Sequence, residues 1–345
     1  MSIKISILIP SYNSIKYIKE ALKSAVNQTF KDIEIICIDA NSNDGTLEFL
    51  KEEQRKDERI RIILSDKKSL GYQLNLGFKE AKGEYLTIIE SDDYARLDMC
   101  EKLYELALKY NCDIIKSDIM HFTRREKQYK VISYEANLYN KILKEQDKIE
   151  LIQHSLIAYQ GAIYKLDFIR KFKIKANESD GASFQDTGVF FITLSLADSI
   201  YLHNESLYFY RKDNENYSIH SKEKIYCVCD EYDFIYNFLN KCDKELMKKL
   251  FAVFLYKKFK AYWWNLKRID NKFKLDFIKR FALEFEPVID KLDKNFFTNG
   301  EIRELKEIIK DPENFYKRYK SPFFKLRKKG ARLKRKIKSL FKNDK

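Results

Sequence analysis

Three carboxylates, Glu90, Asp92 and Asp93, lie within four positions at the end of the apolar segment 85–89. Like charges this close repel one another, which is tolerable in open solvent or around a cation. Carboxylate oxygens are hard ligands that suit Mg²⁺ or Mn²⁺ and leave coordination positions for water and a substrate diphosphate. The pattern therefore indicates a divalent metal site. The alternative is a solvated turn, or a cap in which Asp92 or Asp93 begins the next helix.

Apolar segments that suit strands alternate with segments of helical spacing over the first half of the chain. We expect strands at 3–9, 33–38, 60–64 and 85–89, and helices at 15–26, 46–54, 73–81 and 99–110, with Asn13 or Ser14 capping the first helix. This alternation predicts an α/β fold with a mostly parallel sheet flanked by helices on both faces. The turns "PSYN", "DANSNDG" and "ESDD" follow three of these strands. Ligands bind beyond the carboxyl ends of such strands, so the three turns should converge on one site.

The second half is less regular. We expect a helix at 186–196, short strands at 200–203 and 207–210, and aromatic-rich helices after residue 220. The predicted organisation is an α/β domain at 1–220, a helical C-terminal region at 221–320 and a basic amphipathic tail at 321–345.

Composition narrows the class of protein. The chain has 345 residues, is 45% hydrophobic and carries a formal net charge of +14. It contains no stretch long enough for a membrane-spanning helix, and its first residues do not form a signal peptide, so we expect a cytoplasmic location. The six cysteines include no C-x-x-C pair, which argues against a zinc or thioredoxin-like site.

Two long segments carry a family resemblance. "ISILIPSYNSIKYIKEALKSAVNQTFKDIEIICIDANSNDGT" and "SLGYQLNLGFKEAKGEYLTIIESDDY" resemble the N-terminal signature of the family 2 glycosyltransferases, which have the Rossmann-like GT-A fold. The resemblance runs over residues 3–120. It implies a nucleotide-sugar donor, inverting transfer and Mn²⁺ or Mg²⁺ as cofactor. The Q-x-x-R-W motif of the processive branch is not found, which favours the addition of one or a few sugars.

The resemblance also implies the donor-binding residues. Pro10, Tyr12 and Asn13 would lie against the nucleoside, and Asp39 would accept a hydrogen bond from the base. The alternatives are a strand-ending turn for "PSYN" and a turn or cap role for Asp39. Asn75 would help to shape the donor pocket.

The acidic motif of the family corresponds to Glu90-Ser91-Asp92-Asp93. This makes Asp92 the main metal ligand, with Asp93 in support. Glu90 stands where Asp is usual and would contact the ribose side or the metal through water, and Ser91 belongs to the same donor-binding motif.

Further along the chain, the resemblance points to two residues of a loop that closes over the diphosphate. Arg211 would contact phosphate oxygens and His220 would be a third metal ligand, although a single His in a polar loop is more often simply exposed.

Inverting transfer also needs a base that removes the proton from the acceptor hydroxyl. Asp186 precedes an apolar helix at a place where the family often has an acidic pair ending in Asp, and here Gln185 replaces the first acid. We expect Asp186 to be the base. Helix N-capping is an alternative that is compatible with this role.

The implied reaction uses a UDP-hexose or UDP-N-acetylhexosamine and a glycan or lipid-linked glycan acceptor, as in bacterial surface polysaccharide or lipooligosaccharide synthesis. A catalytically inactive, glycan-binding member of the family is an alternative, supported by Glu90 and Gln185. A nucleic-acid-binding protein is disfavoured, because the aromatic residues recur at helical spacing and the basic residues are concentrated in the tail. A dehydrogenase is excluded because the first turn lacks G-x-G-x-x-G.

The tail predicts attachment to the inner face of the cell membrane, and the alternative is a disordered, solvated tail. Within "FFKLRKKGARLKRKIKSLF", apolar residues are interspersed with Lys and Arg, as in interfacial helices. Each basic residue near an anionic leaflet contributes about 1 kcal/mol. The full chain should float with anionic liposomes, and a version that ends at Ser321 should not. Equal flotation of the two would contradict this prediction.

Overall fold

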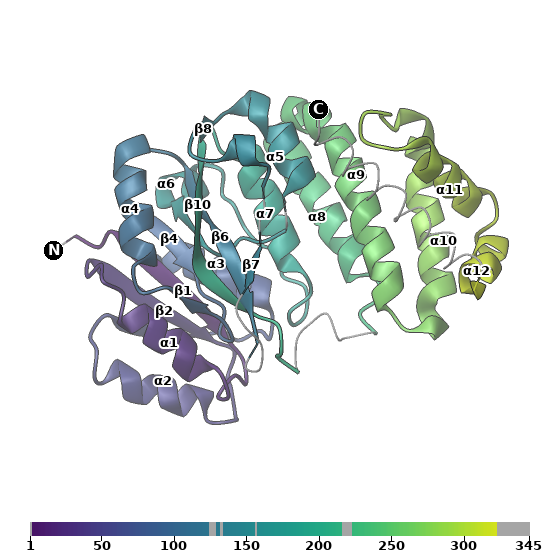
Figure 1. Cartoon of the computed structure of the whole chain (residues 1–345). Helices are drawn as coiled ribbons and strands as arrows, with labels where there is room; N and C mark the ends of the chain where they lie inside the picture. The colour runs from purple at the N-terminus through teal and green to yellow at the C-terminus, as the bar shows by residue number, and fades with distance from the viewer. Residues whose placement is uncertain (1, 124–128, 132–133, 156, 216–222, 323–345) are drawn as a thin grey trace. The chain divides into compact units, whose positions relative to one another are not determined.

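The computed structural model describes residues 2–322, apart from 124–128, 132–133, 156 and 216–222. A ten-stranded mixed sheet forms the centre of the first part of the chain, with the order β3-β2-β1-β4-β9-β6-β10-β5 and with β7 and β8 paired to β6 and β10 (Figure 1). The basic tail from residue 323 onward and His220 lie outside the described residues.

The first four long strands are parallel and give the sheet its binding edge. The strands are β1 (Ile5–Ser11), β2 (Ile33–Asp39), β3 (Ile60–Leu64) and β4 (Tyr85–Ile88). Helices α1 (Ile18–Val26), α2 (Thr46–Gln54), α3 (Leu70–Glu80) and α4 (Met99–Tyr110) alternate with them. The predicted α/β alternation is confirmed. Ser11 is in register with Asp39, so the turns after β1 and β2 begin at the same level of the sheet.

The remaining strands extend the sheet with mixed directions. They are β5 (Tyr94–Ala95), β6 (Ile114–Phe122), β7 (Tyr129–Val131), β8 (Ile142–Leu143), β9 (Ala162–Lys165) and β10 (Ile200–Arg211). Strand β9 runs antiparallel between β4 and β6, whereas β6 and β10 are parallel. Helices α5 (Lys148–His154), α6 (Leu166–Lys171) and α7 (Gln185–Leu196) connect these strands.

Alternate residues of the parallel strands pack against helices on opposite faces. Ile5, Ile7 and Ile9 of β1 share a buried cluster with residues of α1, α2 and α4. Leu8 points to the other face, where a Cβ added to Gly77 of α3 would lie 2.8 Å from its side chain. Successive side chains of a strand point to opposite faces of the sheet. When helices cover both faces, every side chain of the strand is buried, so the strand is a continuous apolar run in the sequence.

Some of the predicted elements were wrong in detail. The two short strands expected at 200–203 and 207–210 are one strand, β10, because pairing with β6 continues across register shifts between His203 and Ser206 and between Ser206 and Tyr208. Strand β6 was missed because Lys116, Ser117 and Asp118 interrupt its apolar pattern, although all three are buried.

Two helix starts also differ from the prediction. Helix α3 begins at Leu70, three residues early, because the Ser69 hydroxyl accepts a hydrogen bond from the Tyr72 N–H at 3.2 Å and caps it. Helix α1 begins at Ile18 after Tyr17, without a side-chain cap. The Asn13 side chain instead accepts a hydrogen bond from the Asn43 N–H, so it links two turns.

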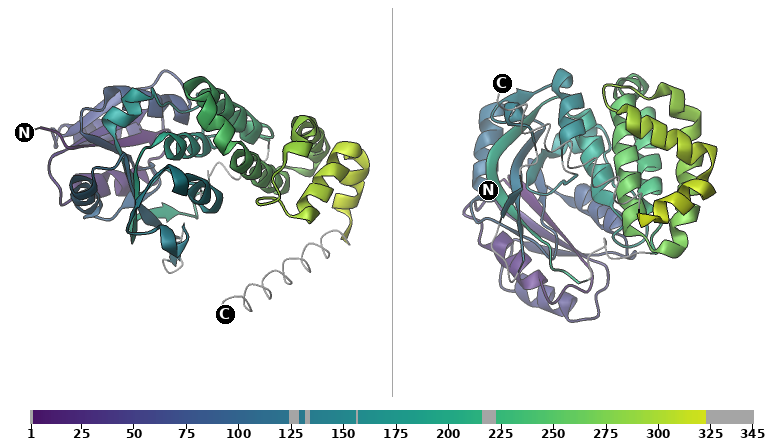
Figure 2. Two further views of the ribbon diagram at one scale, coloured as in Figure 1. Left: turned by 90° about the horizontal axis from the view of Figure 1, so that it is seen from above. Right: turned by 45° about the vertical axis from the view of Figure 1, so that its right-hand side comes forward.

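The chain divides into two compact units, and the first contains residues 1–220 together with 227–253. Helix α8 (Cys227–Cys242) packs against α7, and the first unit continues to Val253 within α9 (Lys244–Arg268). The second unit contains α10 (Lys274–Phe285), α11 (Asn299–Lys310) and α12 (Pro312–Lys320), which lie together in both views of Figure 2.

Aromatic side chains form the interior of the second unit. Phe259, Tyr262, Phe281 and Phe285 are each at most 1% exposed and meet in edge-to-face pairs. The aromatic residues that recur at helical spacing in the sequence therefore fill a core. Across the described ranges of the chain, we find no helix with the length and apolarity required to cross a membrane.

Candidate active site

The turns after β1 and β2 are tied together by hydrogen bonds around Asp39. The buried Asp39 carboxylate accepts hydrogen bonds from the Ser11 hydroxyl at 2.8 Å and from the backbone N–H and hydroxyl of Ser42, both at 2.7 Å. Asn13 donates its N–H to the Ser42 hydroxyl at 2.9 Å and accepts from the Asn43 N–H at 3.0 Å. Asp39 thus has the turn role that the sequence left open, and it fixes the two turns in one conformation.

Tyr12 and Pro10 differ in their accessibility. Pro10 is buried within β1, whereas the Tyr12 ring is 41% exposed with the Lys68 ammonium 4.7 Å from its centroid. An exposed aromatic ring beside a cation suits the binding of a planar group that carries negative charge nearby.

Helix α3 joins these turns to a more distant segment. The Gln73 amide donates to the backbone carbonyls of Ser11 at 2.8 Å and Ile38 at 2.6 Å. Two residues further along, the Asn75 amide donates to the Ala176 carbonyl at 3.0 Å and accepts from the Ala176 N–H at 2.8 Å. Asn75 therefore fixes the segment around residue 176 rather than presenting a free amide.

Glu90 begins the acidic turn after β4, and hydroxyl groups surround it. Its carboxylate accepts a hydrogen bond from the Tyr159 hydroxyl, and its N–H donates to the Tyr208 hydroxyl at 3.0 Å. Burial raises the pKa of Glu90 to about 8, and the charges of Asp92 and Asp186 add to this, against a lowering by the hydrogen bonds.

Asp93 is a structural centre of the turn. It is 2% exposed, and its two oxygens accept hydrogen bonds from the Tyr208 hydroxyl and the Arg211 N–H, both at 2.8 Å. Burial, followed by the charge of Asp92, holds its pKa well above the usual range. With both oxygens engaged by the protein, Asp93 supports the turn and joins it to β10.

Asp92 is held less tightly than its neighbour. Its Oδ2 accepts a hydrogen bond from the Asn214 amide at 2.6 Å, and burial raises its pKa. Ser91, beside it, is half-buried in the same turn. Of the three acids, Asp92 is therefore the one best able to change partners.

Arg211 is buried and faces the protein. Its Nε donates to the Asp92 carbonyl at 2.7 Å, and another guanidinium nitrogen pairs with Glu20. The group is 4.8 Å from the centroid of the Tyr17 ring and 4.5 Å from that of Phe122. In this conformation Arg211 positions the acidic turn rather than offering a free cation.

Asp186 lies in the first turn of α7, after the N-cap residue Phe184, so it is not the cap residue. Its Oδ1 accepts a hydrogen bond from the Thr187 N–H at 2.9 Å. Burial raises the pKa of Asp186 to about 6, against a lowering by backbone hydrogen bonds. The charge of Asp186 raises the pKa values of Glu90 and Tyr159, which means that β4, β9 and α7 bring these groups to one place.

Sequence reasoning missed several residues of this site. Tyr159 and Tyr208 are fully buried and resemble ordinary core aromatics, so nothing in their sequence context distinguishes them. Gln185, which the sequence did single out as the substitute for an acid, is buried and donates to Ser179 and Gly181, which shapes the loop before α7. Glu231 could have been identified from the sequence, because it is a charged residue on the apolar stripe of α8 with Val228 and Ile235.

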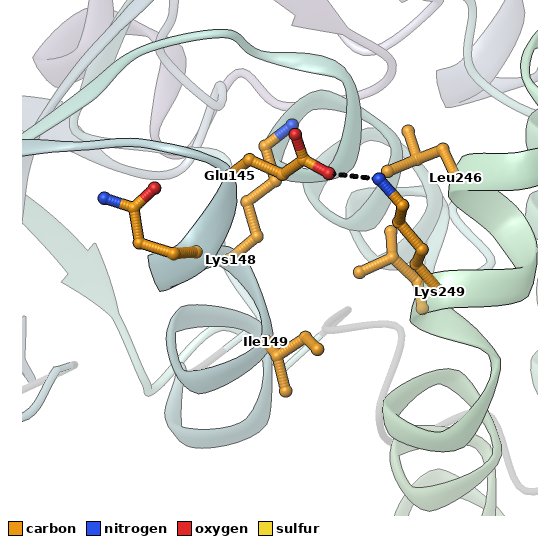
Figure 3. A pocket seen from close by; sticks show the side chains of 7 residues that line it. Glu145, Lys148, Ile149, Leu246 and Lys249 are labelled. Carbon is orange, nitrogen blue, oxygen red and sulfur yellow. Dashed lines mark hydrogen bonds and ion pairs between the residues drawn. The ribbon is translucent and has the colours of Figure 1, made fainter.

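A separate pocket of about 530 Å³ lies beside α5 and the first turns of α9 (Figure 3). An ion pair between Glu145 and Lys249, 2.6 Å long, crosses it, and Ile149 and Leu246 contribute apolar surface. The pocket shares no residue with the acidic turn. In the ranges that the structure describes, no three His, Cys, Asp or Glu side chains are grouped to hold a metal.

Comparison with known proteins identifies the domain that carries this site. Residues 6–171 match the family described as "Glycosyl transferase family 2". The chain therefore carries a domain of the family 2 glycosyltransferases. The matched segment covers β1 to α6 and includes the turns after β1, β2 and β4.

Curated relatives and a solved structure agree with this assignment. Glycosyltransferase GlyA of Streptococcus pneumoniae serotype 4 is 28% identical over 222 residues, which is 60% of this chain but only 30% of GlyA. Poly(ribitol-phosphate) beta-glucosyltransferase of Bacillus spizizenii is 40% identical over 115 residues, or 32% of this chain and 18% of that protein. Residues 1–349 of S. aureus TarS share the fold, with a TM-score of 0.69 and 18% identity over 91% of this chain and 89% of that one.

Loss of the Tyr208 hydroxyl should destabilise the enzyme. Tyr208→Phe leaves a buried Asp93 oxygen and the Glu90 N–H without their partner, which costs about 1–3 kcal/mol. Urea unfolding followed by circular dichroism measures the free energy. Tyr134→Phe is the matched control, since that buried hydroxyl has no hydrogen-bond partner among the described residues. Equal unfolding free energies for the two variants would contradict this role of Tyr208.

Proposed function

We propose that this family 2 glycosyltransferase catalyses the inverting, non-processive transfer of a sugar from a UDP-sugar to a hydroxyl of a glycan or lipid-linked glycan. The donor would be a UDP-hexose or UDP-N-acetylhexosamine. The observation that carries the proposal is the convergence of Asp186 with the acidic turn, because the two are far apart in sequence and yet interact electrostatically.

The acid-rich turn fits a divalent cation. Burial raises the pKa values of Glu90, Asp92 and Asp93, so their negative charges lack the solvation they would have in water. Asp92 would hold Mn²⁺ or Mg²⁺ together with diphosphate oxygens, with Asp93 in support and His220 as a further ligand. When bound, the cation would neutralise the charge that develops on the leaving diphosphate.

Asp186 would act as the base of the reaction. Its carboxylate takes the proton of the acceptor hydroxyl as the acceptor oxygen attacks the anomeric carbon. The bond between that carbon and the diphosphate oxygen breaks, and the electron pair leaves with UDP. Because the pKa of Asp186 is about 6, the group is a stronger base than an ordinary aspartate and is still ionised at pH 7.

The turns after β1 and β2 would bind the nucleoside. Pro10, Asn13 and Asp39 give a preformed edge, and the exposed Tyr12 ring is available for stacking. Asn75 would support the donor pocket by holding the segment after α6. Solved complexes of TarS with UDP and with UDP-GlcNAc support a uridine donor.

The remaining donor contacts would come from the acidic turn and β10. Glu90 and Ser91 would face the ribose side, and Arg211 would reach the phosphates after rearrangement of its present contacts. The basic tail would bring the enzyme to the inner face of the membrane, where lipid-linked acceptors are found, with residues 1–220 as the transferase domain. The charge of the tail supports this location.

Removal of the Asp186 carboxylate should separate binding from turnover. Asp186→Asn should bind UDP-sugars normally but lose at least 100-fold in kcat, a loss within the usual contribution of a general base. Asp198→Asn, an exposed position just beyond the other end of α7, is the control. Retained turnover in Asp186→Asn removes this residue from the base role.

The pH dependence of the wild-type enzyme gives a second test of the base. Burial raises the pKa of Asp186 to about 6, so kcat should fall as the pH decreases through 6, where protonation removes the base form. An ordinary aspartate would place this loss near pH 4. Rates measured from pH 4.5 to 8 distinguish the two, and a constant kcat down to pH 5 would contradict the assignment.

The metal proposal rests on Asp92. Hydrolysis of UDP-sugars without acceptor should require Mn²⁺ or Mg²⁺ in the wild-type enzyme, and Asp92→Ala should abolish it while the circular dichroism spectrum is unchanged. Thermal shifts with a panel of UDP-sugars and Mn²⁺ identify the donor. Metal-independent activity, or full activity of Asp92→Ala, would refute this part, and the absence of any hydrolysis or transfer would favour an inactive glycan-binding protein.

A further inference from the structure

Glu231 is a buried carboxyl group that the proposed mechanism does not use. It lies on α8 and is 0% exposed. Its Oε2 accepts a hydrogen bond from the Asn177 amide at 3.1 Å, and the backbone of Gly188 also hydrogen-bonds to the carboxyl group. Burying a carboxyl group is costly, and an apolar residue would suit the stripe of Val228 and Ile235 better. A specific contact must therefore account for a glutamate at this buried position.

Oε1 of Glu231 faces the first turns of α7. A Cβ added to Gly188 would lie only 2.0 Å from Oε1, so the carboxyl group fills the space that the missing side chain leaves. Gly188 is two residues after Asp186, on the same helix. Helices α7 and α8 run side by side in Figure 1, and the contacts between them agree. Glu231 thus sets how closely α8 approaches the turn that carries Asp186.

The other oxygen connects Glu231 to the donor side of the site. The Asn177 backbone carbonyl packs so closely on α3 that a Cβ added to Gly71 would lie 1.8 Å from it. Asn75 of α3 holds the neighbouring Ala176, and Gln73 of the same helix holds the turns after β1 and β2. One continuous set of contacts therefore runs from the nucleoside turns through α3 and Asn177 to Glu231.

The protonation state of Glu231 agrees with a role in supporting Asp186. Burial raises the pKa of Glu231 to about 8, the Asn177 amide lowers it, and the charge of Asp186 raises it further. At pH 7 Glu231 is thus mostly protonated while Asp186 is ionised. Glu231 can hold the helix without adding a second negative charge beside the base.

We propose that Glu231 is a positioning residue that fixes the first turn of α7, and with it Asp186, relative to the donor-binding turns. The inference deepens the proposed function and rests on Asp186 as its base. A displacement of a reacting group by about 1 Å can cost 100-fold in rate. A looser α7 should therefore lower kcat more than it weakens donor binding.

The kinetic test compares Glu231→Ala with Glu231→Gln. The alanine variant should lose at least tenfold in kcat with a donor KM within twofold of wild type. The glutamine variant should recover kcat to within threefold, because its amide oxygen can still accept from Asn177 and it fills the same space. Glu34→Gln is the matched control, since Glu34 is a buried carboxyl group that accepts hydrogen bonds from Ser6, Arg61 and Lys82 at the opposite end of the strands. An alanine variant within twofold of wild-type kcat overturns the proposal, as does an equal loss in kcat and in donor affinity.

Gly188→Ala keeps the test valid if Glu231→Ala fails to fold. Alanine favours the helix, but its Cβ collides with the Glu231 carboxyl group and should displace it, lowering kcat at least fivefold. In the Glu231→Gln background the collision remains, whereas in the Glu231→Ala background Gly188→Ala should cause no further loss. A wild-type kcat in Gly188→Ala overturns the proposal.

Hydrogen exchange separates this inference from the proposed function. The amides of the first turn of α7 should exchange at least tenfold faster in Glu231→Ala or Gly188→Ala than in wild type or Glu34→Gln, whatever reaction the enzyme catalyses. Unchanged exchange overturns the positioning contact. Faster exchange in a protein without any sugar transfer supports the contact and refutes the proposed function alone.

Discussion

The structure depends on keeping several carboxyl groups close together beneath the surface of one site. Glu90, Asp92, Asp93 and Asp186 each have a raised pKa, and burial is the largest cause in every case. Their hydrogen-bond donors include neutral groups, such as the hydroxyls of Tyr159 and Tyr208 and the amide of Asn214. Neutral donors hold the oxygens in place without cancelling their charge. Raised pKa values favour the protonated forms of these groups, and a bound cation would favour the ionised forms and displace the protons.

Holding such a cluster requires a stiff surrounding, and α3 and β10 provide it from two sides. Gln73 of α3 bridges the ends of β1 and β2, while Asn75 holds the segment that leads to α7. On the other side, β10 contributes Tyr208 and Arg211 to the acidic turn. The hydrogen bonds of Gln73 and Asn75 end on backbone atoms, whereas Tyr208 and the Arg211 N–H bond to the Asp93 carboxylate. This arrangement fixes the turns around the site and leaves Asp92 as the acid with fewer such contacts.

The part of this arrangement that follows strand periodicity could be predicted. Apolar runs and the turns after them locate β1, β2 and β4, and parallel pairing brings their ends together without further information. Strand β6 could not be found in this way because Lys116 and Asp118 are buried polar residues, and their partners, the Gln160 carbonyl and Tyr139, come from distant segments. The same holds for Tyr208, whose role depends on pairing between β10 and β5. The roles of these residues depend on pairing between segments far apart in the sequence, and the local sequence pattern contains no information about that pairing.

Arg211 shows how a residue type can be identified correctly while its contacts remain unpredictable. A guanidinium group in a polar loop suggests a free phosphate ligand, but this one is buried between Tyr17 and Phe122 and is bonded to Glu20 and to the Asp92 carbonyl. Its burial follows from the end of β10, which places residue 211 level with Phe122 of β6. A charge in such a position is retained when it fixes a neighbouring group. Here that group is the backbone of the acidic turn.

Glu90 can be explained by the same reasoning. A glutamate is one methylene longer than the aspartate usual at this place, and its carboxylate reaches the Tyr159 hydroxyl in the loop before β9. That contact lies on the side of Asp186, whose charge raises the pKa of Glu90. The longer side chain therefore joins the acidic turn to the part of the site that holds Asp186, the proposed base. Asp93 is fully engaged by Tyr208 and Arg211, so Asp92 remains as the acid with the greatest freedom to meet a cation. Glutamate at position 90 thus leaves Asp92, the proposed metal ligand, in place.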